Sequence, residues 1–151
     1  MIDQDINSQQ FIVFRTGNQE FSVEMGSTRE IKSWTKATKL PNSEEYVVGI
    51  INLRGTIVPI VDLSLRLGLQ KIEERDQNVI IVVKLHDKQF GLLVESVSDI
   101  IEASEDQLRP VPELSTKYSE EFFRQVIVLE NRIICEVVLD KLVPEMDAMA
   151  A

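Results

Sequence analysis

The strongest constraint on the fold is a series of four pairs of strand-like apolar runs, in which a short turn sequence separates the two members of each pair. Such pairs predict antiparallel hairpins, because parallel strands need a much longer crossover. At 151 residues, the chain is long enough for two small barrels that pack as one cooperative unit. The sequence therefore predicts an all-β fold with hairpins at residues 11–25, 47–62, 79–95 and 125–139.

The second hairpin carries the clearest local signals. Its turn is Arg54-Gly55, where glycine can supply the positive φ that a two-residue turn requires. Pro59 lies in its second arm and predicts an edge strand or a bulge, because proline cannot donate a ladder hydrogen bond. Asp62 is expected to cap a short helix over residues 63–67, which ends at Gly68.

Three segments lie outside these hairpins and set the expected domain limits. Residues 1–10 are expected to be a flexible N-terminus, and the charged connector at residues 70–77 predicts a boundary between two subdomains. The polar stretch 104–121 predicts a long surface loop. Residues 144–151 are predicted to form a C-terminal helical tail, with an apolar stripe of helical spacing at Leu142, Met146 and Met149.

Charge and hydropathy disfavour several classes of function. The formal net charge of -9 repels a phosphate backbone, and no local basic patch was identified, so nucleic-acid binding is not expected. The apolar runs are strand-sized, whereas a membrane-spanning helix needs about 20 residues. The N-terminal residues lack the cationic region of a signal peptide, which predicts a cytoplasmic protein without membrane insertion.

The residues that could carry chemistry are few and scattered. His86 is the only histidine and lies in a predicted turn, so neither a zinc site nor a catalytic triad can be assembled around it. Cys135, the only cysteine, lies in an apolar run and is expected to be a buried structural thiol. The glycines are dispersed and form no phosphate-binding loop. We therefore expect no enzymatic activity, no cofactor and no metal.

A longer motif points to a known family. Residues 48–63, Val-Gly-Ile-Ile-Asn-Leu-Arg-Gly-Thr-Ile-Val-Pro-Ile-Val-Asp-Leu, resemble the signature hairpin of the CheW family of chemotaxis coupling proteins. Residues 29–31, 90–100 and 108–112 are also similar to that family. The resemblance implies a single domain over residues 11–143, made of two intertwined SH3-like five-stranded barrels.

The resemblance also implies an adaptor function. Members of the family join the cytoplasmic helical hairpin of methyl-accepting chemoreceptors to the regulatory domain of the histidine kinase CheA, in arrays at the membrane. By the same resemblance, Glu30, Gly49 and Arg54 match receptor-binding positions, and Val79 matches a neighbouring groove position. The kinase-binding residues are not identified.

Each matched position also has a plainer interpretation. Arg54 is either a solvated turn residue or the partner of a carboxylate, for which its guanidinium is well suited. Glu30 is either a solvated carboxylate on a helix face or the partner of Arg54. Gly49 serves a strand bend, the close approach of a partner helix, or both.

Two departures from the family pattern and two alternative functions remain. Thr28 stands where an apolar residue is common, and Glu95-Ser96 replaces a more usual aspartate-glycine pair. The alternative functions are an adaptor in a related pathway controlling non-flagellar motility or gene expression, and a small-ligand-binding β-barrel. The latter requires convergent polar groups in a pocket.

Overall fold

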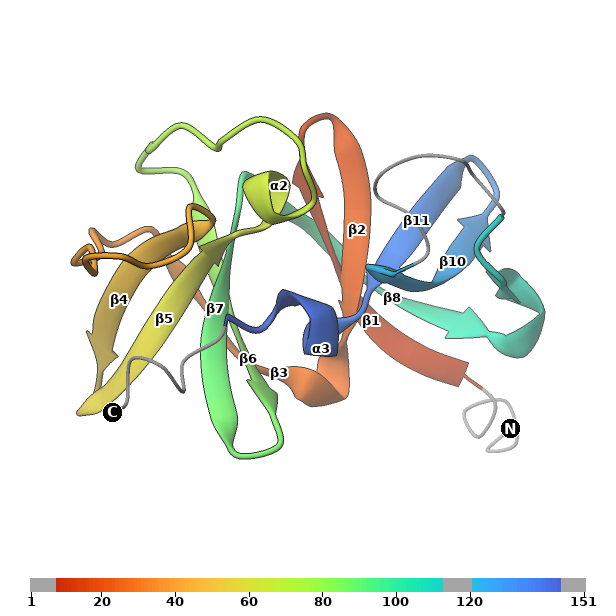
Figure 1. The fold of residues 1–151 in the computed structure, drawn as a ribbon. Helices are drawn as coiled ribbons and strands as arrows, with labels where there is room; N and C mark the ends of the chain where they lie inside the picture. Colours follow the sequence, from red (N-terminus) through yellow and green to blue (C-terminus); the bar gives the residue numbers. More distant parts are fainter. Residues whose placement is uncertain (1–7, 113–120, 145–151) are drawn as a thin grey trace.

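The computed structural model describes residues 8–112 and 121–144, which form two β-sheets and a few short helices (Figure 1). The six-stranded sheet has the order β8 (Ser96–Ser104), β1 (Ser8–Thr16), β2 (Gln19–Glu24), β11 (Arg132–Val137), β10 (Phe123–Leu129) and β9 (Leu108–Arg109). The five-stranded sheet has the order β3 (Thr28–Ser33), β6 (Val79–Leu85), β7 (Lys88–Val94), β5 (Thr56–Asp62) and β4 (Val47–Leu53). The helical turns are η1 (Met25–Ser27), α2 (Leu63–Arg66), η2 (Glu105–Gln107) and α3 (Leu139–Leu142).

The predicted all-β fold with short helices is confirmed, and so are the four hairpins. At the second hairpin, Arg54 and Gly55 both have positive φ, 52° and 90°, as a two-residue turn requires. Asp62 caps α2, since its side chain accepts a hydrogen bond from the Leu65 amide. Pro59 lies on an internal strand, but β5 begins its parallel pairing with β7 only at Ile60, so the proline lies just outside that ladder.

The predicted subdomain boundary at residues 70–77 is wrong. This connector joins β5 and α2 to β6, and β5 and β6 belong to the same five-stranded sheet. The second and third hairpins share that sheet, whereas the first and fourth share the six-stranded one, where β11 pairs parallel to β2. The chain therefore passes from one sheet to the other and back, through η1 and again between β7 and β8.

Two strands were missed, and one loop was assigned too broadly. β8 is nine residues long and pairs with β1 along its length, although its mixed polar sequence shows no clear alternation. β3 pairs with β6, so the helix-face position considered for Glu30 is wrong and Glu30 lies on a strand. The segment 104–121, predicted as a loop, contains η2 and the short strand β9.

Three apolar clusters form the core, and one of them joins the two sheets. The largest lies between the sheets and takes Phe14 and Phe21 from one, and Ile81 and Leu92 from the other. A second cluster lies on the opposite face of the five-stranded sheet, and a third lies on the opposite face of the six-stranded sheet. Because side chains alternate along a strand, β6 supplies the first two clusters in turn and is apolar throughout.

Arg66 on α2 ties the two sheets together at a second place. Its guanidinium carbon lies 4.5 Å from the ring centre of Tyr46, which precedes β4, and 4.9 Å from that of Phe122, which precedes β10. Its Nη2 donates a 2.8 Å hydrogen bond to the carbonyl of Lys141 in α3. This stacking joins segments that are far apart in sequence.

The predicted C-terminal helical tail at residues 144–151 falls almost wholly outside the described residues. The last helix of the described residues, α3, lies earlier in the chain, and its Leu142 is fully buried in the cluster between the sheets. Leu139, the first residue of α3, was expected to end the last strand. The last strand instead ends at Val137.

A buried carboxylate lies on β11. Glu136 is 2% exposed; its Oε1 accepts a 2.8 Å hydrogen bond from Gln125, and its Oε2 is 3.8 Å from Nε of Arg124. Burial raises the pKa of Glu136, against the opposing effects of Gln125 and Arg124, and the nearby Glu24 adds to the increase. The folded protein therefore holds this proton more tightly than the unfolded chain does.

We expect Glu136→Gln to be more stable than the parent at pH 7, by on the order of 1 kcal/mol, because it removes a buried charge and keeps the acceptor oxygen. Since the pKa of Glu136 is raised by folding, its contribution to stability is present below its unfolded pKa and is lost as pH rises through the folded pKa. Urea unfolding from pH 4 to 7 should show the two proteins converging at low pH. Equal pH dependence in both proteins would contradict this account, and the exposed Glu102→Gln is the control.

Candidate functional site

The turn between β4 and β5 presents Arg54 at the end of a rigid hairpin. Its conformation is braced by Asn52, whose side-chain oxygen accepts a 2.8 Å hydrogen bond from the amide of Gly55. The Arg54 side chain is 72% exposed and forms an ion pair with Glu30 on β3, Nη2 donating to Oε1. The hydrogen bond from Arg54 holds the pKa of Glu30 below its ordinary value. The predicted pairing of these two residues is thus found in the structure, at the exposed rim of the five-stranded sheet.

Gly49 lies behind this rim and is buried. A Cβ atom at this position would lie 2.4 Å from the carbonyl oxygen of Thr38, and the residue has a φ of +154°. Thr38 and Ile50 exchange two backbone hydrogen bonds, of 2.9 and 2.8 Å. The space left by the missing side chain is therefore filled by the chain itself, at the place where the segment after β3 meets β4.

Val79 lies apart from the ion pair. It is half-buried, pairs with Ser33 and Val94, and packs against the cluster between the sheets. Glu30 pairs with Val82, three residues further along β6, which corresponds to about 10 Å. The structure thus brings Glu30 and Arg54 together, places Gly49 behind them and leaves Val79 on the same sheet at some distance.

Two exposed isoleucines were not identified from the sequence. Ile31 follows Glu30 and is 43% exposed, and Ile57 lies two residues after the turn and is 56% exposed. Ile57 lies in an apolar run that looks buried, and Ile31 lies in a polar strand that was not predicted, so only the tertiary structure reveals their exposure. Large apolar side chains exposed beside a fixed charge are typical of protein-binding surfaces.

The two departures from the family pattern have local roles. The Thr28 hydroxyl donates a 3.3 Å hydrogen bond to the carbonyl of Glu24 across η1. The Glu95 carboxylate accepts a 2.8 Å hydrogen bond from the amide of Gly17, in the turn between β1 and β2. Both residues stabilise connections between the sheets.

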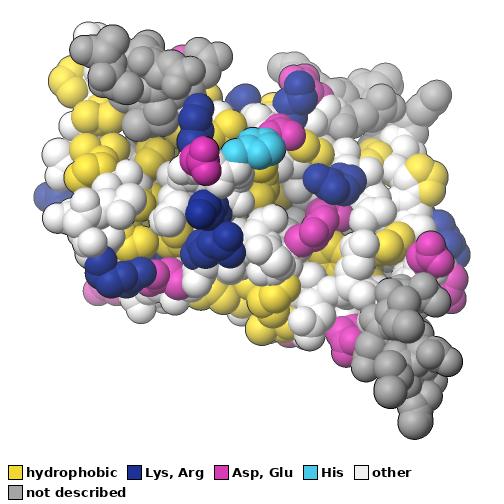
Figure 2. Space-filling model, turned by 90° about the horizontal axis from the view of Figure 1, so that it is seen from below, with side chains coloured by type: hydrophobic (Ala, Val, Ile, Leu, Met, Phe, Trp, Pro, Cys, Tyr) yellow, Lys and Arg dark blue, Asp and Glu magenta, His cyan; other side chains and the backbone are white. Residues whose placement is uncertain are grey.

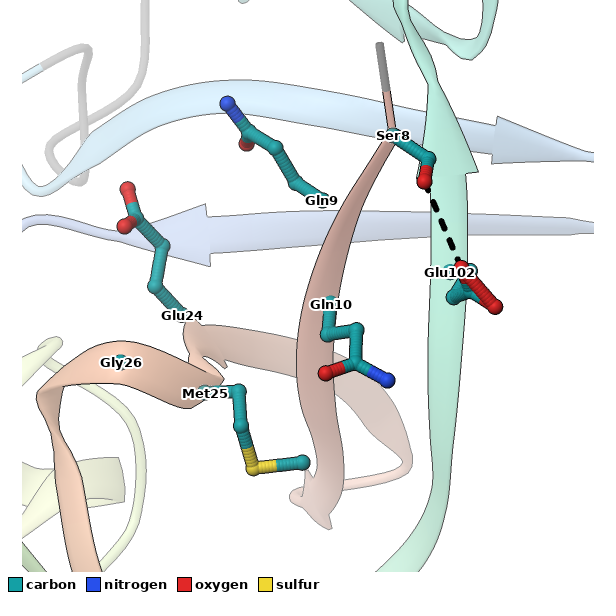
Figure 3. A pocket seen from close by; sticks show the side chains of 7 residues that line it. All are labelled: Ser8, Gln9, Gln10, Glu24, Met25, Gly26 and Glu102. Carbon is teal, nitrogen blue, oxygen red and sulfur yellow. Dashed lines mark hydrogen bonds between the residues drawn. The ribbon is translucent and has the colours of Figure 1, made fainter. Parts of the chain in front are cut away.

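A large hollow lies elsewhere, at the ends of β1, β2 and β8. It has a volume of about 690 Å³ and is open to solvent, and Figure 3 shows Glu24 and Glu102 on opposite sides of Gln10. The hydroxyl of Ser8 donates a 3.3 Å hydrogen bond to Glu102. The hollow contains none of the four site residues suggested by the resemblance, and its polar groups do not converge on one point.

The other residues with reactive side chains lie apart from one another. His86 occupies an exposed turn between β6 and β7, as predicted. Cys135 is half-buried rather than fully buried, and burial raises the pKa of its thiol. Residues 8–112 and 121–144 contain no group of three side chains placed to bind a metal ion. The same ranges contain no helix long and apolar enough to cross a membrane.

The two sheets with an ion-paired, partly apolar rim define a small β-type scaffold of the kind that binds other proteins. A protein-family model for the CheW-like domain matches residues 10–146, and the chain belongs to this family of chemotaxis scaffold proteins. It is 43% identical to the chemotaxis protein CheW of Rhizobium meliloti (strain 1021) over 143 residues, covering 95% of this chain and 92% of the relative. It is 32% identical to the chemotaxis protein CheW of Bacillus subtilis (strain 168) over 137 residues, covering 88% of each.

A solved structure has the same fold. The crystal structure of the scaffolding protein TtCheW from Thermoanaerobacter tengcongensis superposes with a TM-score of 0.80 at 27% sequence identity. The match covers 86% of this chain and 88% of that one. The CheW fold implied by the resemblance is therefore confirmed, with one sheet of six strands and one of five rather than two of five.

Proposed function

We propose that this protein is a non-enzymatic chemotaxis adaptor that couples chemoreceptors to the histidine kinase CheA. It acts in the cytoplasm and is recruited to receptor arrays at the membrane. One surface binds the cytoplasmic helical hairpin of the receptor, and another binds the regulatory domain of the kinase. The observation that carries this proposal is the Arg54–Glu30 ion pair, which lies at an exposed rim beside Ile31 and Ile57.

The position of the two isoleucines supports a helix-in-groove contact. Ile31 pairs with Ile81, which faces the cluster between the sheets, and Ile57 shares a strand face with Val61 of the same cluster. Both exposed side chains therefore belong to the face that packs, further along, against the other sheet. A receptor helix lying there would cover them with its apolar stripe, while the fixed charge of Arg54 sets its orientation.

The kinase contact is proposed on the other sheet. Val128 and Ile133 are cross-strand neighbours near the end of the β10–β11 hairpin, and they are 36% and 68% exposed. An exposed cross-strand apolar pair offers a compact surface to a second barrel. The two binding surfaces then lie on different sheets, as an adaptor that holds both partners at once requires.

Substituting Arg54→Ala should weaken receptor binding at least about ten-fold, because arginine is among the residues that dominate interface energies. Folding should be unaffected, since the side chain is 72% exposed. Arg75→Ala is a matched control, because Arg75 forms an exposed ion pair with Glu73 on the connector at residues 70–77. The affinity is measured as binding to a surface-immobilised receptor hairpin. An unchanged affinity of the Arg54→Ala variant would rule out this rim as the receptor-binding surface.

Co-purification with a tagged chain would identify the partners and the pathway. The adaptor function predicts a chemoreceptor and a CheA-type kinase among them. Partners from a non-flagellar motility or gene-regulatory system would instead favour the related adaptor.

A further inference from the structure

Basic side chains gather where the two outer strands of the five-stranded sheet, β3 and β4, approach each other. We call Arg29, Lys32, Lys36 and Arg54 the basic edge. With Glu30 they carry a net charge of +3, so the rest of this chain, whose total is -9, carries -12. The sequence alone does not reveal this group, because Arg54 is distant in sequence and the other three are spaced along a strand and the segment after it.

Two contacts bring these residues together. β3 and β4 are the outer strands of the five-stranded sheet, and the Arg54–Glu30 ion pair joins them. Eight residues after Glu30, Thr38 pairs with Ile50 through its backbone. The segment after β3, which carries Lys36, therefore runs beside β4, whereas Lys32 lies on β3 itself, where it pairs with Ile80 of β6. Lys32 also lies close enough to Glu30 to contribute to lowering the pKa of that carboxyl.

The cations of this edge, apart from Arg54, have little to neutralise them. Within the ranges that the structure describes, neither the Lys32 nor the Lys36 side chain forms a hydrogen bond or an ion pair, and Lys36 is exposed. Lys32 interacts with Glu30 only through the attraction of their charges. Arg29 is exposed and donates only a 3.4 Å hydrogen bond to the carbonyl of Gly26. Arg132, by contrast, donates to both Glu20 and Asp99. The basic edge is thus free to meet anionic groups of another molecule.

The surroundings of these cations favour a protein partner over a membrane. Ile31 is 43% exposed on the edge strand β3, and Lys32, the next residue, points to the opposite face together with Glu30. A partner that lies along this edge strand therefore meets an apolar side chain on one face and a positive charge on the other. Each cation near an anionic membrane contributes about 1 kcal/mol to binding. A net charge of +3 on the basic edge gives too little attraction to offset the repulsion of the membrane by the charge of -12 on the rest of the molecule. On the face seen in Figure 2, acidic side chains are interspersed with basic ones, and no continuous basic surface is present.

We propose that the basic edge steers and orients an acidic helical partner, whose carboxylates flank the apolar stripe that covers Ile31. This inference rests on the proposed function and adds to it, because the partner is the receptor hairpin and its recognised groups are carboxylates. Complementary charge at an interface chiefly accelerates association, and salt screens this effect.

The test compares the parent with a Lys32→Gln/Lys36→Gln variant in binding kinetics to a receptor hairpin fragment, at about 50 and about 500 mM salt. At low salt the variant should associate about three- to ten-fold more slowly, with little change in dissociation rate. At high salt the two proteins should converge. Arg109→Gln, on β9 at the edge of the other sheet, removes one exposed charge as a control and should behave as the parent does.

The failure of this inference and the failure of the proposed function would give different results. Equal association rates and equal salt dependence in variant and parent would overturn the basic edge as a steering surface, while receptor binding that requires Arg54 would leave the adaptor function intact. Vesicles containing anionic phospholipid form the second arm and should not retain the parent protein. Retention that the double variant abolishes would overturn the assignment to a protein partner. If the parent does not bind the receptor fragment at all, both proposals fail.

Discussion

Phe21→Ala should lower the free energy of unfolding by about 3–5 kcal/mol, a large part of the 5–15 kcal/mol typical of a domain. Phe21 is 1% exposed, stacks on Phe123 at a ring-centre distance of 6.0 Å and lies 6.4 Å from Phe14. Its cluster contains side chains from both sheets, so the loss should destabilise the two sheets together. Urea unfolding followed by both circular dichroism and tryptophan fluorescence should show one shifted, coincident transition.

Ile133→Ala is the matched control on the same sheet. Its side chain is 68% exposed, so its removal should change stability by no more than about 0.5 kcal/mol. Trp34, the only tryptophan, packs against the cluster inside the five-stranded sheet and reports on that sheet. If Phe21→Ala gave two separate transitions, with the fluorescence transition unshifted, the prediction of a single domain over residues 11–143 would be wrong.

Gly49→Ala should destabilise the protein by about 2–4 kcal/mol, because its methyl group would collide with backbone rather than with a movable side chain. The added carbon would lie 2.4 Å from the carbonyl oxygen of Thr38 and 3.0 Å from Cβ of Ala37. Relief of this overlap requires the segment at Thr38 to move away from Ile50, with loss of their two hydrogen bonds. Thermal unfolding measures the effect.

Gly26→Ala provides the comparison, since a Cβ there would meet no atom within 4 Å. Receptor binding by the Gly49 variant distinguishes the two roles considered for this glycine. We expect weaker binding together with lower stability, because the substitution disturbs the contact between Thr38 and Ile50 that supports the Arg54–Glu30 ion pair. A Gly49→Ala protein with parental stability and no receptor binding would show instead that the partner contacts Gly49 directly.

Local signals in the sequence were sufficient for the hairpins. Alternating apolar residues and a turn such as Arg54-Gly55 act over a few residues, and the structure contains all four predicted pairs. The assignment of hairpins to sheets was not predictable in this way. The parallel pairings of β11 with β2 and of β5 with β7 join segments far apart in sequence, and no local pattern specifies them. The connector at residues 70–77 was therefore mistaken for a boundary.

The candidate site was predictable in part, and for a similar reason. The resemblance selected Glu30 and Arg54, and opposite charges made their pairing a natural hypothesis, which the structure bears out. The close approach of Thr38 to Gly49 was not predictable, because Thr38 lies in a segment without a regular pattern of apolar residues. Exposure of Ile31 depends on β3 being an edge strand, which is a property of the whole sheet.

Three-component sedimentation tests the adaptor role most directly. Membranes containing a chemoreceptor are mixed with CheA, with and without this protein, and the kinase in the pellet is measured. We predict that the kinase sediments with the receptor chiefly when this protein is present, and that Arg54→Ala reduces the amount. Equal amounts of pelleted kinase with and without the protein, or a protein that remains in the supernatant in every mixture, would contradict the account.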